Sequence, residues 1–192
     1  GRQRRLNSVG ESVLQIAPSA TAAYSLRSLT GGDPKVVRVR RDTDGGAGDN
    51  DEQDFTASGI SSGALVAFVG SGNDGFVETW YDQSGNSNDA VQATAGSQPK
   101  IVSAGSLNTS GGLEFDGSDD FFSLTSSFSF QNKAGCVFSL QDGQDSPNDF
   151  TLGTSSSSRG IGFRNILTRW FYTTGAIDID NSSPPSGLAL FT

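Results

Sequence analysis

Three residue types are scarce or missing in this 192-residue chain, which has no histidine, no methionine and one cysteine. The lack of histidine excludes imidazole-based triads, imidazole acid–base catalysis and histidine metal sites, so any catalysis would have to use carboxylates. Cys136 has no partner for an internal disulfide, and its setting Ala-Gly-Cys-Val-Phe predicts a small buried residue of a strand. Because position 1 is not methionine, we expect either a processed chain or part of a longer one.

Long apolar runs are missing as well. No stretch approaches the ~18 apolar residues that a membrane helix requires, and no secretory apolar region opens the chain, so we expect no membrane partner. Glycine is abundant, with 25 residues, and the 34% of hydrophobic residues include 13 phenylalanines. This mixture favours one domain of short strands joined by turns around a packed core, rather than long helices.

The net charge of −8 is divided unequally along the chain. Residues 1–41 carry eight basic and two acidic side chains, whereas residues 42–192 carry five basic and nineteen acidic ones. The division predicts a basic arm, with Arg2, Arg4 and Arg5 at its start, attached to an acidic body. We expect the arm to dock onto other proteins of an assembly, and the acidic body disfavours nucleic acid as a partner.

Local patterns predict a series of short elements. Pro18–Leu29 is predicted as a helix, because a proline stands in its first turn and its apolar residues share one face. Alternation predicts strands at Lys35–Arg41 and Phe76–Tyr81, and grouped apolar residues predict a short helix at Ser61–Phe68. Further short strands are predicted at Ala90–Ala93, Lys100–Val102, Gly112–Asp116, Phe121–Thr125, Gly135–Leu140, Gly160–Phe163 and Thr168–Thr173.

Many short strands at close spacing are typical of an antiparallel sandwich or barrel. We therefore predict an all-β protein with one or two short helices near its N-terminus. Residues 1–17 would form the basic arm or linker and residues 18–181 the sandwich. Residues 182–192, which include Pro184 and Pro185, would form a linker or the start of a continuing C-terminal segment.

The acidic loop 42–54 is a candidate calcium site, because hard cations bind clustered carboxylates on flexible loops. Its spacing departs from the helix–loop–helix calcium pattern, with Ala47 in place of glycine and Gln53 in place of glutamate. A loop that is simply solvated is the alternative. The candidate ligands are Asp42, Asp44, Asp49 and Asp51.

Residues 79–90, which read TWYDQSGNSNDA, have two interpretations. Aromatic faces stack on sugar rings while amides and carboxylates bind hydroxyl groups, so this stretch could contact a carbohydrate. The same Asp, Ser and Asn residues also build turns at the end of a strand, and Gly85 permits the positive φ that such turns use. Alternation places Val77 on the more apolar face and Trp80 nearer the surface. The candidate carbohydrate-binding residues are Trp80, Tyr81, Asp82, Gln83, Asn86 and Asn88.

Glu114 and Asp116 form a second candidate pair. Residues i and i+2 of a strand share a face, and retaining glycosidases need two carboxyl groups about 5 Å apart. The alternative is a structural one, in which Phe115 points inward, Glu114 is solvated and residues 116–119 make a turn.

An ordered series of segments resembles a known family. It is similar to the N-terminal part of the catalytic domain of fungal-type α-L-arabinofuranosidase B, and to a domain of phage and marine bacterial surface proteins, including virion structural proteins. Leu113–Phe122 (LEFDGSDDFF) resembles the strand–turn–strand of laminin G-like and concanavalin A-like lectin modules. The resemblance implies a concanavalin A-like antiparallel β-sandwich, or jelly roll. The segments are Ala22–Arg27, Val37–Arg41, Glu52–Phe55, Ala64–Gly70, Phe76–Ala90 and Gln98–Val102.

The catalytic carboxylates and paired cysteines of the arabinofuranosidases have no matching stretch in this chain. The resemblance therefore implies a non-enzymatic phage virion structural protein, from a tail, a fibre or a capsid decoration, with host-surface carbohydrate as its candidate ligand. We expect a homo-oligomer or a member of a larger assembly, with no cofactor unless calcium binds. Two alternatives stay open: a glycoside hydrolase of arabinofuranosidase type, and an extracellular adhesion module of a bacterial surface.

Overall fold

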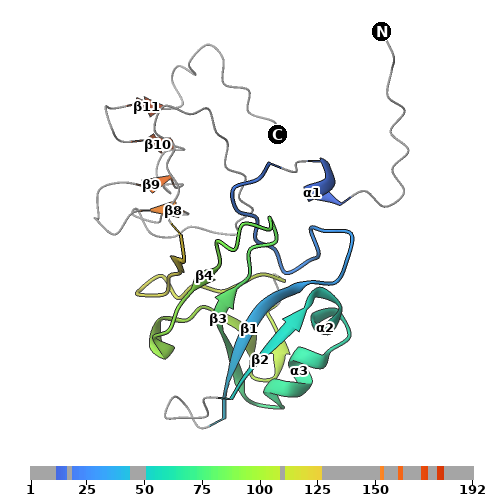
Figure 1. Cartoon of the computed structure of the whole chain (residues 1–192). Coiled ribbons are helices and arrows are strands. Elements are labelled where there is room, and N and C mark those ends of the chain that lie inside the picture. Colours follow the sequence, from blue (N-terminus) through green and yellow to red (C-terminus); the bar gives the residue numbers. More distant parts are fainter. Residues whose placement is uncertain are drawn as a thin grey trace. The chain divides into compact units, whose positions relative to one another are not determined.

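The computed structural model describes most of the first 126 residues and a few short strands after them (Figure 1). By internal contacts the chain divides into two units, residues 1–131 and 132–192. The described residues are 12–16, 19–43, 51–108, 111–126, 152–153, 160–161, 170–172 and 177–179.

The first unit is built on one antiparallel sheet of seven strands. The strands are β1 (Lys35–Asp42), β2 (Glu52–Thr56), β3 (Asp74–Trp80), β4 (Ala90–Val91), β5 (Lys100–Ser103), β6 (Ser106–Leu107) and β7 (Ser123–Leu124). Their order is β2-β1-β3-β4-β7, with β5 paired to β3 and β6 paired to β5.

Strand β3 is the centre of this sheet. One of its edges pairs with β1, while the other edge is shared, with β4 at its carboxyl end and β5 at its amino end. Between these two partners the amide of Val77 donates to the carbonyl of Pro99 at 2.9 Å. The carboxyl end of β3 therefore leads directly into the turn that follows Trp80.

Alternation of side chains along β3 matches its burial. Gly75, Val77 and Thr79 are buried, whereas Phe76 and Trp80 are partly exposed. This pattern confirms the predicted strand and the expectation that Val77 lies on the buried face while Trp80 lies nearer the surface.

Two short helices, α2 (Ala57–Ser61) and α3 (Ala64–Val69), lie together beside β1 and β2 (Figure 1). The Thr56 side chain caps α2 by accepting the amide of Gly59 at 3.1 Å, which satisfies one of the free amides of a helix start. The helix predicted at Ser61–Phe68 is found as α3, beginning a few residues later. The core beneath consists of Val36, Val37, Val39, Phe55, Leu65, Val69, Val77, Ile101 and Val102.

Gly75 allows α3 to pack directly on the sheet. A Cβ atom at this position would lie 2.8 Å from Val69 Cγ2, 3.2 Å from Val102 Cβ and 3.3 Å from Val39 Cγ1. Side chains from a helix and two neighbouring strands thus occupy the space that any larger residue would need.

The predicted helix Pro18–Leu29 is wrong. A single turn of helix, α1 (Val13–Ile16), stands before it, and residues 19–29 contain neither helix nor strand. The reason is that the main chain of residues 20–29, here named the strap, is hydrogen-bonded by side chains of the turn after β3. Those bonds replace the ones that a helix would make within itself.

The second unit contributes four described strands that form two antiparallel pairs. They are β8 (Leu152–Gly153) with β9 (Gly160–Ile161), and β10 (Trp170–Tyr172) with β11 (Ile177–Ile179). The strands predicted at 160–163 and 168–173 are found here in shorter form. The all-β antiparallel class is confirmed, while the sandwich arrangement stays a prediction.

Several predicted features lie outside the described residues. They are Arg2, Arg4 and Arg5 of the docking arm, the strand Gly135–Leu140 with Cys136, and residues 182–192. In the part of the chain that is described, no helix is both long and apolar enough to cross a membrane.

Candidate functional site

Asp82 is the centre of the turn that follows β3. Its Oδ1 accepts the amides of Ala23 and Ser84, each at 2.8 Å, and its Oδ2 accepts the Ser84 hydroxyl at 2.7 Å and the Asn88 amide at 3.1 Å. Burial by itself raises the pKa of Asp82, but the hydrogen bonds from Ser84, Ala23 and Asn88 outweigh burial and hold this pKa below its usual value. The carboxylate therefore stays ionised and fastens the turn to the strap.

Gln83 makes the longest series of contacts to the strap. Its Nε2 donates to the carbonyls of Ser25 and Arg27 at 2.9 and 3.0 Å, and its Oε1 accepts the amide of Leu29 at 2.7 Å. Its own amide donates to the carbonyl of Ala23 at 2.8 Å. The side chain is buried, and all three of its polar bonds go to main-chain atoms.

Asn86 and Asn88 hold the start of the strap. Asn86 Nδ2 donates to the carbonyls of Ala20 and Thr21 at 2.9 and 3.1 Å, and Asn88 Nδ2 donates to Thr21 at 2.8 Å. In return the Tyr24 hydroxyl donates to the carbonyl of Asn88. We name Asp82, Gln83, Asn86 and Asn88 together the clasp, because all four side chains bind the main chain of the strap.

Trp80 lies beside the clasp but within an aromatic cluster. Its ring contacts those of Tyr24 and Phe122, with centroids 5.6 and 6.2 Å away. Its indole Nε1 is buried and has no hydrogen-bond partner in the described part of the chain. Trp80 therefore packs against the core as a hydrophobic side chain more than it presents a face to a ligand.

Tyr81 points into a charged network on β1 and β2. Its hydroxyl donates to Asp54 Oδ1 at 2.7 Å, and Asp54 also pairs with Lys35 at 2.5 Å and with Arg38 at 3.2 Å. Arg38 pairs in addition with Glu52 at 2.9 Å. Burial, and then the hydrogen bond to Asp54, raise the pKa of Tyr81 to about 12, so its hydroxyl stays protonated at neutral pH.

Of the six residues singled out as carbohydrate contacts, four form the clasp. Trp80 and Tyr81 lie apart from it, in the aromatic cluster and in the charged network. The polar side-chain atoms of the clasp bind the protein's own main chain, which is the behaviour of a strand-ending turn. Carbohydrate contact at these residues stays a prediction. No local pattern in the sequence indicates the partner of the clasp, because that partner is the backbone of a segment about 60 residues earlier.

The calcium candidates are only partly within the described residues. Asp42 ends β1 with its Oδ2 3.9 Å from Arg40 Nη1, and Asp51 Oδ2 lies 2.6 Å from Arg41 Nη2. Asp44 and Asp49 lie outside the described residues. The two described carboxylates thus each stand near an arginine, and calcium binding by this loop stays a prediction.

A different acidic cluster occurs in the turn 116–120. Ligand oxygens of Asp116, Asp119 and Asp120 lie within 4.8 Å of one another. Hydrogen bonds from the amides of Ser118 and Asp119 hold the pKa of Asp116 below its usual value, whereas burial and the neighbouring carboxylates raise the pKa of Asp120. The cluster is a turn with unequal carboxyl groups, and its oxygens could reach a cation.

The prediction for Glu114 is confirmed, whereas the prediction for Phe115 is wrong. Glu114 is exposed, as the structural alternative expected, and its backbone pairs with Lys100 through two hydrogen bonds of 2.8 Å. Phe115 does not point inward, because it is 47% exposed and meets Phe122 edge-on at 6.0 Å. The physical reason is that Glu114 makes only an isolated bridge, so the chain leaves the sheet at once and Phe115 has no core to enter.

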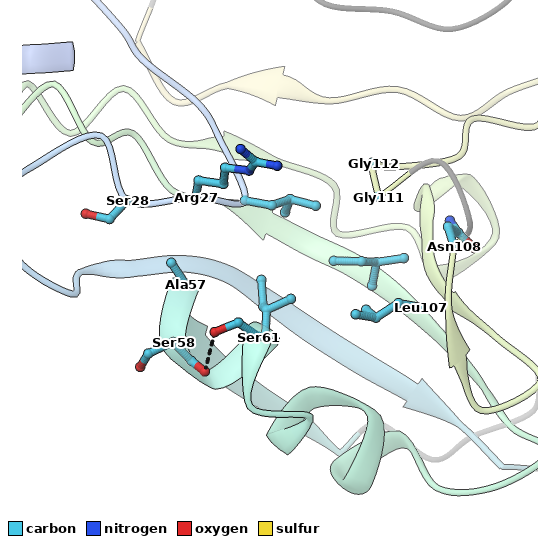
Figure 2. A pocket seen from close by; sticks show the side chains of 12 residues that line it. Arg27, Ser28, Ala57, Ser58, Ser61, Leu107, Asn108, Gly111 and Gly112 are labelled. Carbon is cyan, nitrogen blue, oxygen red and sulfur yellow. Dashed lines mark hydrogen bonds between the residues drawn. The ribbon is translucent and has the colours of Figure 1, made fainter. Parts of the chain in front are cut away.

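A pocket of about 390 Å³ opens between the strap, α2 and the segment after β6 (Figure 2). Its polar groups are largely bonded within the protein. The Ser61 hydroxyl donates to the carbonyl of Ser58 at 3.1 Å, and Asn108 Nδ2 donates to the carbonyl of Lys100 at 2.8 Å. The lining residues are Leu26, Arg27, Ser28, Ala57, Ser58, Ile60, Ser61, Ile101, Leu107, Asn108, Gly111 and Gly112.

Comparison of the chain with protein-family models, with curated proteins and with solved structures found no match. The observations that bear on function are therefore the contacts of the clasp, the acidic turn and the pocket, together with the sequence motifs.

Proposed function

We propose that the protein is a non-enzymatic structural module of a phage virion, in a tail, a fibre or a capsid decoration. The observation that carries this proposal is the clasp. Asp82, Gln83, Asn86 and Asn88 form the motif that distinguishes the sequence, and their polar atoms hold the protein's own strap in place. This use of the motif favours a scaffold role over a catalytic one.

The fold that we propose is the concanavalin A-like sandwich. The seven-stranded antiparallel sheet of the first unit and the two antiparallel pairs of the second unit support it. The basic N-terminal arm, with Arg2, Arg4 and Arg5, would dock the module to other virion proteins. The acidic remainder of the chain would face the surroundings.

Two half-exposed phenylalanines offer a surface for a host glycan. Phe115 and Phe121 are 47% and 53% exposed, and they flank the carboxylates of Asp116 and Asp119. Aromatic faces and carboxylates together provide the stacking and the hydrogen bonds that sugars require. Glycan-array binding that is lost in Phe121→Ala but kept in Asn86→Ala would place the glycan here rather than at the clasp. The opposite pattern would place it at the clasp.

The virion role is tested on the particles themselves. Mass spectrometry of purified particles from a culture that carries the gene should detect this chain in a fixed ratio to the major capsid or tail protein. Particles that contain none of it would contradict the proposal. A glycan array without any signal would remove only the carbohydrate part.

A glycoside hydrolase is the second candidate, and one observation favours it. Asp116 and Asp120 lie close together with pKa values displaced in opposite directions, as expected for a carboxylate and a carboxylic acid that share a site. Release of nitrophenol from a nitrophenyl arabinofuranoside, abolished in Asp120→Asn, would support this reading. The absence of activity in the intact protein would exclude that substrate.

A further inference from the structure

The side chains of the clasp bind only main-chain atoms of the strap. Ala20, Thr21, Ser25 and Arg27 are bound through their carbonyls, and Ala23 and Leu29 through their amides. The side chains of these six residues take no part in the bonds. The clasp thus recognises the main chain of the strap rather than its side chains.

Two strap side chains add selectivity to this recognition. Tyr24 packs its ring on Trp80 and donates its hydroxyl to the carbonyl of Asn88, and Leu26 packs against the core. A segment fits the clasp when its main chain can follow the path of the strap and it carries an aromatic hydroxyl and an aliphatic side chain two residues apart. The strap of any copy of this chain meets these requirements.

The connection between strap and sheet is short and contains two glycines. Residues 30–34, here named the tether, read Thr-Gly-Gly-Asp-Pro, and Gly31, Gly32 and Asp33 are exposed. No atom lies within 4 Å of the place where a Cβ of Gly32 would stand. At its far end the tether is fixed, because Asp33 Oδ1 accepts the amide of Ser58 at 3.0 Å. Two glycines therefore join the strap to a fixed point on α2, and the Ser28 hydroxyl of the strap donates to the carbonyl of Gly32 at 2.7 Å.

We propose that the clasp is an exchangeable docking site whose second occupant is the strap of another copy of this chain. In a single copy the short tether gives the strap an effective concentration on the order of millimolar, which favours its own clasp. When many copies are held together at a similar local concentration, a neighbouring strap competes with the chain's own because the contacts are identical. Exchange joins two copies without any new interface, which is the general route to swapped dimers. It requires no virion role and no glycan.

Deletion of Gly31 and Gly32 tests the proposal. It removes up to about 7 Å of reach, so the strap can no longer enter its own clasp but can still enter another. The full chain with this deletion should elute as a dimer with twice the monomer mass by light scattering. Insertion of two further glycines is the matched control and should leave a monomer. A deletion variant that unfolds at the wild-type urea midpoint and stays monomeric up to high concentration would overturn the proposal.

Cross-linking tests exchange without altering the tether. The Ser84 hydroxyl lies 3.4 Å from the main-chain carbonyl of Thr21, which makes the two residues neighbours. Thr21→Cys and Ser84→Cys are therefore made in separate full-length chains that also carry Cys136→Ser. After the two chains are mixed at high concentration and oxidised, a disulfide-linked heterodimer is expected, with a yield that rises with concentration. Thr21→Cys mixed with Gly96→Cys is the control and should give at least tenfold less. No heterodimer above this control at any concentration would refute exchange.

Discussion

Asp82 receives four hydrogen bonds from three residues, two of which belong to the turn and one to the strap. A carboxylate with so many donors is the most sensitive point of the clasp. When it is removed, the amides of Ala23, Ser84 and Asn88 lose their acceptor while they remain partly buried. At the scale of single residues, the strap is therefore held chiefly by the cost of leaving polar groups unpaired.

Asp82→Ala should lower the free energy of unfolding by about 2–4 kcal/mol, since bonds to a charged group and buried donors are lost together. Urea unfolding followed by tryptophan fluorescence measures the change. Asp51→Ala is the matched control, because Asp51 makes an ion pair with Arg41 and its side chain is 62% exposed. The control should change stability by no more than about 0.5 kcal/mol. Equal effects of the two substitutions would contradict the role given to Asp82.

Acid should weaken the fold through the aspartates whose carboxylates accept hydrogen bonds in the folded protein. The pKa values of five aspartates lie below the usual 3.8 in the folded protein, so each contributes stability above about pH 4. They are Asp33, Asp54, Asp74, Asp82 and Asp116. This stability is lost as the pH falls through their lowered folded values. Asp120 acts with the opposite sign, because its raised pKa gives stability that is lost as the pH rises through its folded value.

The measurement is the free energy of unfolding in urea at a series of pH values. We expect little change from about pH 7 to pH 5 and a fall below about pH 4. Asp82→Asn should reduce the steepness of that fall. A stability that rises on acidification below pH 4 would show that Asp120, rather than the aspartates with a lowered pKa, dominates.

At the scale of elements, the packing of α3 on the sheet depends on Gly75. The nearest atom to its missing Cβ is Val69 Cγ2 at 2.8 Å, a distance that real Cβ contacts do not reach. Gly75→Ala should therefore cost about 1–3 kcal/mol through forced movement of α3 or β5. Gly96→Ala is the matched control, since nothing lies within 4 Å of its Cβ position, and should alter stability by less than about 1 kcal/mol. Thermal unfolding followed by circular dichroism compares the two, and an unchanged Tm for Gly75→Ala would show that the core adapts freely.

The same scale shows what the sequence could predict. Strand β3 was predictable because its burial alternates as its sequence does, with Val77 and Thr79 buried and Phe76 partly exposed. Strand β1 was also found from its alternating residue types, but its burial does not alternate, because Val39 and Arg40 are both buried. The strap was not predictable, because the apolar spacing of Ala22, Leu26 and Leu29 satisfies a helix equally well. Its conformation is decided by bonds from residues about 60 positions later, which no local window contains.

The candidate site shows a similar division. Asp82, Gly85 and Asn86 could be assigned to a turn from their residue types, and Gly85 does adopt a positive φ of 89°. The partner of the turn could not be found, since a main-chain segment has no side-chain signature. Phe115 failed for a related reason, because alternation assumes a continuous strand and the sheet pairing ends at Glu114.

At the scale of the whole molecule, the described sheet, core and clasp all belong to residues 1–131. A chain cut after Gln131 should therefore fold by itself. We expect cooperative urea unfolding with a native emission from Trp80, the one tryptophan that this piece contains. The intact chain provides the reference. A piece that unfolds without a cooperative transition would show that residues 132–192 are needed for the first unit to fold.

The separation between strap and clasp also has a consequence for synthesis on the ribosome. Asp82 follows its strap partner Ala23 by 59 residues, and Asn88 follows its strap partner Thr21 by 67 residues. The strap is therefore made first. Since domains begin to fold as they emerge, the strap leaves the ribosome well before its partner exists and waits unpaired while β1 and β2 appear. On polysomes several nascent copies pass through this stage side by side. The order of translation thus gives each newly made clasp a choice between the strap of its own chain and that of its neighbour.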